Sequence, residues 1–154
     1  MTAPPPCPPR RPAQPALGRW LGAFLAGLAA VGCGGGERTF SEPMVLGGRR
    51  VPADVLNHGE LVYRRDCASC HGLEGHGDGR YAARLSPRPR DLTEGEYPHL
   101  GATGGDLPTD DELRALVRGG IDGTAMRPLP LPDADCEAVV QYLKTLSPRW
   151  RTGA

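Results

Sequence analysis

The stretch DCASCHG, residues 66 to 72, constrains this chain more than any other part of its sequence. It places Cys67 and Cys70 three positions apart, and His71 follows the second thiol directly. Side chains three apart lie close together on a helical turn, so both sulfurs are predicted to reach one common neighbour. The chain must therefore fold around whatever these three side chains hold.

Several kinds of chemistry use closely spaced thiols. A thioredoxin-like redox pair belongs in a βαβ pattern, and this sequence shows no alternation of strands and helices. Structural zinc needs a second pair of ligands, and His76 or His99 with Cys136 gives no recognisable spacing. Thiols that are simply buried or paired are a third interpretation. These three alternatives compete with a fourth, which explains the histidine as well.

The fourth interpretation is covalent haem attachment. Both thiols add to the vinyl groups of haem, and the adjacent imidazole coordinates the iron. The motif therefore predicts one covalently bound haem c held by Cys67, Cys70 and His71. The composition agrees, because 22 Gly, 17 Pro and an aromatic content of 5% predict short helices, many loops and a small core. We expect the macrocycle to complete that core and the apoprotein to fold poorly.

The first 32 residues are predicted to be a signal peptide of the lipoprotein type. Arginines at positions 10, 11 and 19 precede an apolar run at residues 20–31, which is shorter than the roughly 20 residues of a membrane-spanning helix. Ala30-Val31-Gly32-Cys33 resembles the lipobox of bacterial lipoproteins, although that family most often has Leu in place of Ala30. The resemblance predicts an exported chain, lipid-anchored through Cys33 on the periplasmic side of a bacterial membrane. The alternative is an ordinary signal peptide, with Cys33 removed or free.

The rest of the chain is predicted to form a flexible tether at residues 33–50, a folded domain at 51–150 and a tail at 151–154. All 18 Asp and Glu follow Cys33, whereas three of the 18 Lys and Arg precede it, so the exported part is slightly acidic. We identify no basic patch that indicates nucleic acid or anionic lipid headgroups. Nucleic acid is therefore not an expected partner.

Helix signals place the haem motif at the end of a first helix. Pro52 and Ala53 open an amphipathic stretch that runs into the CASCH turn. A glycine-rich loop follows, and a short helix is expected at residues 80–85.

Two further helices are expected in the second half of the chain. Thr109 and Glu112 have the spacing of a capping box, and the Gly119-Gly120 pair ends the helix that the box begins. The last helix is predicted at residues 133–146. Cys136 lies on its apolar face, which indicates a buried and inert thiol.

Together these features resemble a class I cytochrome c over residues 48 to 150. Gly59 and Tyr63 stand where this family packs its first helix on its last, which here carries Tyr142 and Leu143. The closest resemblance is to bacterial single-haem cytochromes, which share GDG at residues 77–79, PRPRDLT at 87–93 and GTAM at 123–126. The resemblance implies an all-α fold of short helices and loops packed around one covalently bound haem.

The resemblance also implies the second axial ligand of the haem iron. Met126 matches the distal ligand motif, so its thioether is expected to bind the iron opposite His71. The other methionine after the signal, Met44, precedes the first helix, and His99 is the competing ligand. Arg127 departs from the Pro that related sequences often have there, and we expect it to alter the redox potential.

The PRPRDLT stretch is expected to support the haem from the histidine side. A carbonyl of Pro87 or Pro89 is expected to accept the ring N–H of His71 and orient the imidazole. Arg90 is expected to pair with a haem propionate, and a solvated surface arginine is the alternative.

The implied function is electron transfer rather than catalysis. We expect a carrier of one electron at a time between donor and acceptor redox proteins of a respiratory chain, with no small-molecule substrate. It would act as a free carrier or as a subunit of a respiratory oxidoreductase complex. The alternative is a haem c enzyme or gas sensor with a displaceable distal ligand, which carbon monoxide binding would identify.

Overall fold

The computed structural model describes residues 38–100 and 106–151. All of them belong to one compact unit, Gly34–Ala154. The elements follow in the order β1 (Met44–Leu46), β2 (Arg49–Val51), α1 (Ala53–Asp66), α2 (Ala68–His71), η1 (Ala82–Arg84), η2 (Leu92–Glu94), η3 (Pro98–Leu100), α3 (Asp110–Gly119), α4 (Asp133–Leu146) and η4 (Pro148–Trp150), where η marks single 3-10 turns. The fold is mostly helical, as predicted. No helix in the described ranges is long and apolar enough to cross a membrane.

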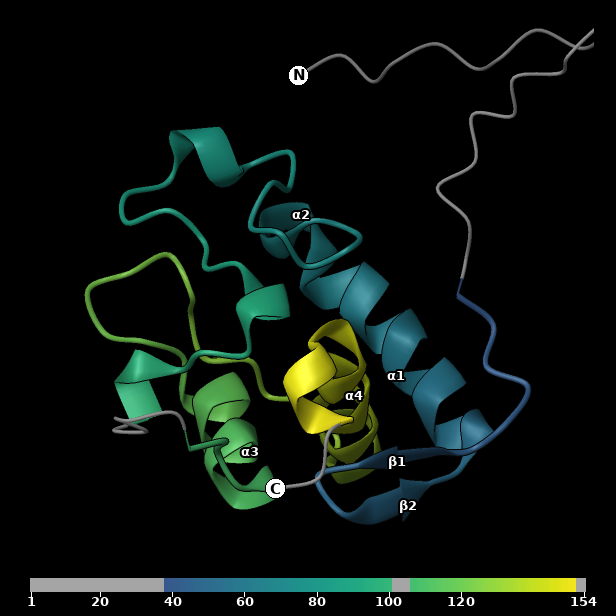
Figure 1. The fold of residues 1–154 in the computed structure, drawn as a ribbon. Helices are drawn as coiled ribbons and strands as arrows, with labels where there is room; N and C mark the ends of the chain where they lie inside the picture. The colour runs from purple at the N-terminus through teal and green to yellow at the C-terminus, as the bar shows by residue number, and fades with distance from the viewer. Residues whose placement is uncertain (1–37, 101–105, 152–154) are drawn as a thin grey trace, which may run out of the picture. The chain divides into compact units, whose positions relative to one another are not determined.

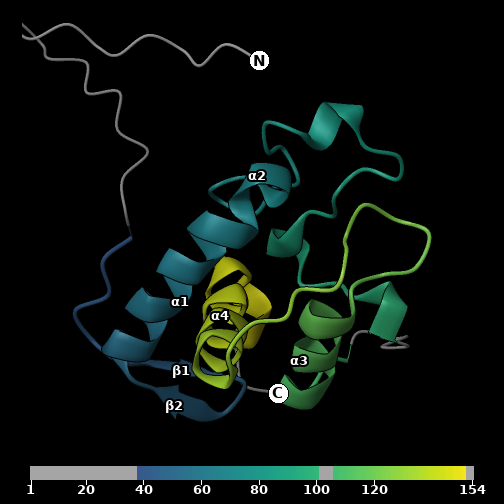
Figure 2. The same cartoon turned by 180° about the vertical axis from the view of Figure 1, so that it is seen from behind.

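Helices α1 and α4 form the centre of the core, and α4 lies between α1 and α3 (Figures 1 and 2). At their crossing, a Cβ on Gly59 would overlap the backbone carbonyl of Ala138, so only glycine permits this approach. One turn later, the rings of Tyr63 and Tyr142 pack with centroids 5.2 Å apart. The predicted packing of the first helix on the last is confirmed.

Helix α4 is buried over most of its length. Every residue from Ala138 to Leu146 is buried, and Cys136 is fully enclosed, as its place on the apolar face predicted. This burial includes three polar side chains, Gln141, Lys144 and Thr145. A buried ammonium is stable only with partners, and neighbouring elements supply them.

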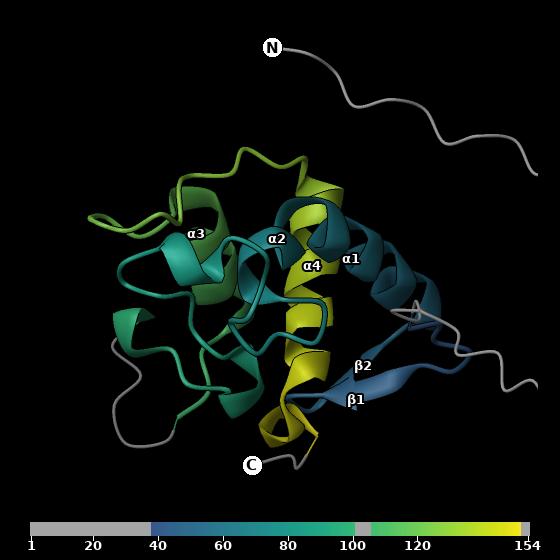
Figure 3. The same cartoon turned by 90° about the horizontal axis from the view of Figure 1, so that it is seen from above.

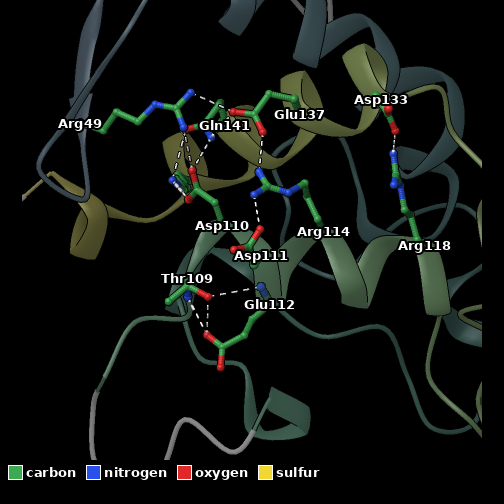
Figure 4. Close-up of polar contacts among 11 residues, drawn as sticks. Arg49, Thr109, Asp110, Asp111, Glu112, Arg114, Arg118, Asp133, Glu137 and Gln141 are labelled. Atoms are coloured by element: carbon green, nitrogen blue, oxygen red, sulfur yellow. Dashed lines mark hydrogen bonds and ion pairs between the residues drawn. The ribbon is translucent and has the colours of Figure 1, made fainter.

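A polar network joins α4 to the start of α3 and to β2 (Figure 4). Asp110 pairs with the Lys144 ammonium and accepts a hydrogen bond of 2.8 Å from Gln141 Nε2. Arg49 reaches the same carboxylate at 3.1 Å and Glu137 at 2.8 Å. Partial burial opposes ionisation of Asp110, but the bonds from Lys144 and Gln141 outweigh it and lower the pKa of its carboxyl.

The predicted capping box at the start of α3 is confirmed. The Glu112 backbone N–H donates to Thr109 Oγ1 at 3.3 Å, and the Thr109 backbone N–H donates to Glu112 Oε2 at 2.7 Å. These two bonds satisfy backbone donors that the first turn of a helix leaves free. The helix therefore begins at the residue after Thr109, where Asp110 can reach α4.

A β-hairpin lies within the range predicted to be a flexible tether. Strands β1 and β2 pair antiparallel, with Leu46 opposite Arg49. Gly47 and Gly48 form the turn with φ of 57° and 74°, the left-handed values that a two-residue hairpin turn requires. The sequence signal was the Gly-Gly pair between two short strand-forming runs.

The residues before the hairpin are also bound to the domain. The backbone N–H groups of Arg38 and Phe40 donate to Glu60 and Asn57 of α1, each at 2.8 Å. The Phe40 ring packs edge-on against Tyr142, with centroids 6.2 Å apart. The tether prediction is therefore wrong for residues 38–50. Residues 33–37 of the tether lie outside the described residues, as does the predicted signal peptide.

Two long connections complete the fold. Residues 72–109 join α2 to α3 and residues 120–132 join α3 to α4, and most of their described residues lie on the side of α4 away from α1 (Figures 1 and 3). The helix expected at 80–85 is a single 3-10 turn, Ala82–Arg84. Leu85 is already extended, with ψ of 140°, as the chain approaches Pro87.

Candidate haem-binding site

The CASCH motif forms one helical turn at the end of α1. The backbone N–H groups of Cys70 and His71 donate to the Cys67 carbonyl at 3.1 and 3.0 Å. All three residues are half-buried, and both thiols are free. Burial raises the pKa of Cys67 to about 12, and the charges of Asp66 and Cys70 add to the rise. A thiol that stays protonated at neutral pH is a poor nucleophile for rapid disulfide exchange.

The imidazole of His71 is oriented by a backbone carbonyl. Its Nδ1 lies 3.2 Å from the carbonyl oxygen of Arg90. Because a carbonyl only accepts hydrogen bonds, Nδ1 carries the proton and the lone pair of Nε2 remains available to a metal. Burial lowers the pKa of His71, although the bond to Arg90 opposes the shift. The ring is thus a neutral imidazole in the tautomer that binds iron.

The carbonyl that holds His71 differs from the one predicted. We expected the carbonyl of Pro87 or Pro89, and the structure places that of Arg90 against the ring. The Pro89 carbonyl instead faces Gly77, where a Cβ would overlap it. The PRPRDLT stretch was identified correctly. Which of its carbonyls faces His71 depends on the close contact between Pro89 and Gly77, because the segment is irregular.

The glycines of the GDG motif allow the returning chain to lie against the CASCH turn. A Cβ on Gly79 would lie 2.6 Å from the backbone of Cys70, whose carbonyl accepts a 3.1 Å hydrogen bond from the Gly79 N–H. The Gly77 N–H donates to the His71 carbonyl at 2.9 Å, with a φ of 69° at the glycine. In sequence the motif was only a family pattern, and the structure supplies its physical reason.

Tyr63 has a second role that sequence reasoning missed. Its hydroxyl donates to the Gly72 carbonyl at 2.7 Å, directly after the CASCH turn, and this bond is buried. Burial raises the pKa of Tyr63, so the hydroxyl remains a donor at physiological pH. One side chain thus links the packing of α1 on α4 to the position of the turn. The aromatic at this spacing was the signal, but its hydrogen bond depends on the tertiary fold.

Met126 lies half-buried in the connection between α3 and α4. The Ile121 N–H donates to the Met126 carbonyl at 2.8 Å, and the Met126 N–H donates to Thr124 Oγ1 at 3.1 Å. The Thr124 hydroxyl donates in turn to the Ile121 carbonyl at 2.8 Å. These bonds close residues 121–126 into a compact turn, which holds the backbone of the methionine in place.

The structure brings together Cys67, Cys70, His71 and the backbone of Arg90. Met126 belongs to the other long connection, on the same side of α4. The Arg90 side chain is exposed, and Cys33 lies outside the described residues. The donor set fits haem c, because two free thiols can form thioethers and a neutral imidazole and a thioether are ligands of haem iron. Within 38–100 and 106–151, no cluster of three or more His, Cys, Asp or Glu is placed to hold another metal ion.

Comparisons with known proteins agree with this site. The family model described as cytochrome c oxidase, cbb3-type, subunit III matches residues 54–143, which is more than half of the chain. Among solved structures, a chain of the Kuenenia stuttgartiensis reducing HAO-like protein complex Kustc0457/Kustc0458 is 34% identical, with a TM-score of 0.60. That alignment covers 63% of this chain and 44% of the other, so this chain spans less than half of its length. No curated protein sequence matches significantly.

The family match extends from the first turn of α1 into α4. It therefore includes the CASCH turn, the GDG and PRPRDLT stretches and the Met126 turn. Sequence, fold and family agree on the type of protein and on its cofactor. The chain belongs to the cbb3-type cytochrome c family, and it is a class I c-type cytochrome whose cofactor is covalently bound haem c.

Proposed function

We propose that this chain carries one electron at a time between respiratory-chain proteins through a single haem with His/Met ligation. Cys67 and Cys70 form the thioethers, and His71 and Met126 are the axial ligands. Bound haem c supplies a one-electron iron couple. The observation that carries the proposal is the contact of His71 Nδ1 with the Arg90 carbonyl, which leaves Nε2 as the ligand atom.

The protein's contribution is to hold the two ligands and to leave no open coordination position. The Arg90 carbonyl sets the plane of the imidazole, and the GDG backbone supports the turn behind it. The closed turn at residues 121–126 limits the movement of Met126. Ligands that move little between oxidation states favour electron transfer, whereas an enzyme or gas sensor needs a position that opens.

We further propose that the chain is exported and lipid-anchored through Cys33 on the periplasmic side. Because Arg38 and Phe40 are bound to α1, only residues 34–37 separate the lipid from the domain. A segment of this length spans at most about 14 Å, at roughly 3.5 Å per residue. The domain would therefore stay close to the membrane surface. This arrangement favours electron exchange with partners in the same membrane. It argues against a carrier that swings on a long tether.

Visible spectra of the export-matured protein test the proposed ligation. We expect haem staining that survives a denaturing gel, sharp bands in the reduced protein and the weak far-red absorption of Met-ligated ferric haem. The reduced protein is expected not to bind carbon monoxide at neutral pH. Stain without the far-red band, together with carbon monoxide binding, would identify the enzyme or gas-sensor alternative. Absence of stain would contradict covalent attachment at Cys67 and Cys70.

Mass spectrometry of the membrane fraction tests the anchor. We expect the mature chain to begin at Cys33 with an acyl modification, and Cys33→Ser to release the protein in soluble form. A wild-type chain that begins elsewhere or carries no lipid would contradict the anchor without affecting the haem proposal.

A further inference from the structure

The carbonyl that orients His71 belongs to an irregular part of the chain. It is part of the peptide group that joins Arg90 to Asp91, and its oxygen lies 3.2 Å from His71 Nδ1. Residues 85–91 form no helix or strand, so no ladder of backbone hydrogen bonds fixes the plane of this peptide. The orientation of His71 must therefore depend on other contacts close to Arg90.

The Asp91 side chain supplies contacts directly after this carbonyl. Its Oδ1 accepts hydrogen bonds from the Thr93 backbone N–H at 2.8 Å and from the Thr93 hydroxyl at 2.6 Å. The hydroxyl bond is the main cause that lowers the pKa of Asp91, so the group is a carboxylate at neutral pH. Its Oδ2 lies 3.3 Å from Nδ1 of His76, and because a carboxylate only accepts hydrogen bonds, His76 is the donor. Both oxygens are thus engaged.

Backbone contacts join the same two segments on either side of this carboxylate. The Leu92 N–H donates to the Gly75 carbonyl at 2.7 Å. At Gly77 a Cβ would lie 3.1 Å from the carbonyl carbon and oxygen of Arg90, so the glycine allows the two backbones to approach. Asp91 lies between Arg90 and Leu92, and its side chain therefore supports both contacts. Unlike them, the Asp91 contacts can be removed by a single substitution.

The hydrogen bond to His71 affects the iron that this side chain is proposed to bind. An imidazole that donates through its Nδ1–H is a more basic ligand, and a more basic ligand favours ferric over ferrous iron. A displaced Arg90 carbonyl would weaken this bond and shift the equilibrium toward reduced haem. Groups that hold the carbonyl therefore act on the reduction equilibrium without touching the iron.

We propose that Asp91 and His76 are positioning residues for the axial ligand. Their contact holds the Arg90 carbonyl in place and, through it, sets the orientation and basicity of His71. The inference rests on the proposed function, and it adds the groups that regulate the reduction equilibrium of the site. It also gives a role to His76, which the sequence suggested only as a candidate zinc ligand.

The reduction equilibrium of the haem-loaded chain tests the role of Asp91. Wild type and variants are equilibrated in one redox buffer at neutral pH, and visible spectra give the ratio of reduced to oxidised haem. We expect Asp91→Ala to raise this ratio about threefold, because it removes the acceptor for Thr93 and His76. An amide both accepts and donates, so Asp91→Asn should keep these contacts and change the ratio by less than about 1.5-fold.

The matched control for charge is Glu94→Gln. It removes an exposed carboxylate from the same 3-10 turn, Leu92–Glu94, and we expect a change below about 1.5-fold. Equal shifts in Asp91→Ala, Asp91→Asn and Glu94→Gln would overturn the proposal, because the charge alone would then explain them.

Hydrogen exchange of the His71 ring tests the route of the effect. The Nδ1 proton is followed by NMR in the reduced chain with ¹⁵N-labelled histidine, after transfer into deuterated buffer. We expect it to exchange at least about tenfold faster in Asp91→Ala than in wild type, and Asp91→Asn to restore slow exchange. A shifted reduction equilibrium with unchanged exchange would overturn the proposal, since the effect would then bypass the hydrogen bond to His71.

His76 provides a second test, which decides the matter if Asp91→Ala takes up no haem. Its side chain is exposed, so we expect its variants to fold. His76→Ala should shift both measurements in the same direction as Asp91→Ala, and His76→Gln, whose amide can donate to Asp91, should restore them. His58→Ala is the matched control, because it removes a histidine–carboxylate contact of 2.8 Å, to Asp135, between α1 and α4. Equal shifts at His76 and His58, or no shift at His76, would overturn the proposal.

Haem staining and spectra of the wild type, recorded first, separate this inference from the proposed function. A wild-type chain without haem, or without the far-red band of Met ligation, would overturn the proposed function and the inference with it. A wild-type chain with both, whose Asp91 and His76 variants show none of these shifts, would overturn the inference alone.

Discussion

The two sides of α4 are held together by different kinds of interaction. On the side of α1 and the hairpin, buried side chains determine the structure, as in the packing of Tyr63 on Tyr142 and of Gly59 on Ala138. On the side of the two long connections, glycines and backbone hydrogen bonds determine it, as at Gly79 and in the Met126 turn. The first side contains its own core. The second contributes Leu92 and Tyr97 to the same core, and we expect bound haem to add further apolar contacts there.

Removal of the haem attachment should give the largest difference in stability between the two sides of α4. In Cys67→Ala/Cys70→Ala we expect no covalent haem, with rapid hydrogen exchange in residues 72–92 and slower exchange in α1 and α4. The physical reason is that only the helical side buries enough apolar surface of its own. Haem staining and hydrogen exchange measure these effects. The matched control is Cys136→Ala, which should keep the stain; stain in the double variant would contradict the assignment.

A methyl group at the crossing of α1 and α4 should give the next largest effect. Gly59→Ala would force its Cβ into the Ala138 carbonyl, and we expect a loss of about 3 kcal/mol in the free energy of unfolding. Urea denaturation of the haem-loaded chain measures it. Gly119→Ala in α3 is the control, because a Cβ there meets nothing within 4 Å, and it should be neutral or slightly stabilising. Equal effects at both positions would show that the crossing does not limit stability.

The Asp110–Lys144 ion pair tests how much a polar contact between α3 and α4 contributes to the free energy of unfolding. Asp110→Asn leaves the Lys144 ammonium, 3% exposed, without its anionic partner, and we expect a loss of about 2 kcal/mol at neutral pH. Thr109→Ser, which keeps the hydroxyl of the neighbouring cap, is the control. A change below about 0.5 kcal/mol for Asp110→Asn would show that the network adds little to stability.

The same pair predicts a pH dependence with a definite sign. In the folded protein the pKa of Asp110 lies below its ordinary value of 3.8, because hydrogen bonds from Lys144 and Gln141 outweigh burial. A carboxyl whose pKa is lower in the folded state stabilises the fold at pH values above its unfolded-state pKa. This contribution is lost as the pH falls through its folded-state pKa. Denaturation at neutral and acidic pH should therefore show Asp110→Asn costing less at about pH 3 than at pH 7. A constant cost would contradict the pKa shift.

The smallest effect on stability is expected at the axial ligand. Met126→Leu keeps the size and apolar character of the side chain, so we expect a change below about 1 kcal/mol in the free energy of unfolding. The far-red absorption should nevertheless disappear and carbon monoxide should bind the reduced protein. Met44→Leu in β1 should retain the wild-type spectrum. If the spectrum of Met126→Leu is also unchanged, His99 becomes the ligand to test.

Prediction from sequence succeeded where local patterns set the structure, and it failed for short strands and for an irregular loop. The start of α1, the bounds of α4 and the capping box at Thr109 follow from local patterns, and the contact of Gly59 with the last helix follows from the family resemblance. The structure confirms these four predictions. The hairpin was missed because its strands are three residues long and resemble linker sequence. The carbonyl that orients His71 was placed one or three residues too early, because nothing periodic sets the register of a proline-rich loop.

The CASCH spacing predicted the cofactor, and the family match supports covalently bound haem c. The sequence also determined the main helices, whose apolar spacing and caps act over a few neighbouring residues. Three contacts became visible only in the folded chain: Arg90 holds His71, Tyr63 supports the turn, and residues 38–40 bind α1. These contacts join residues that are distant along the chain, and their geometry depends on how close α1, α4 and the loops approach one another.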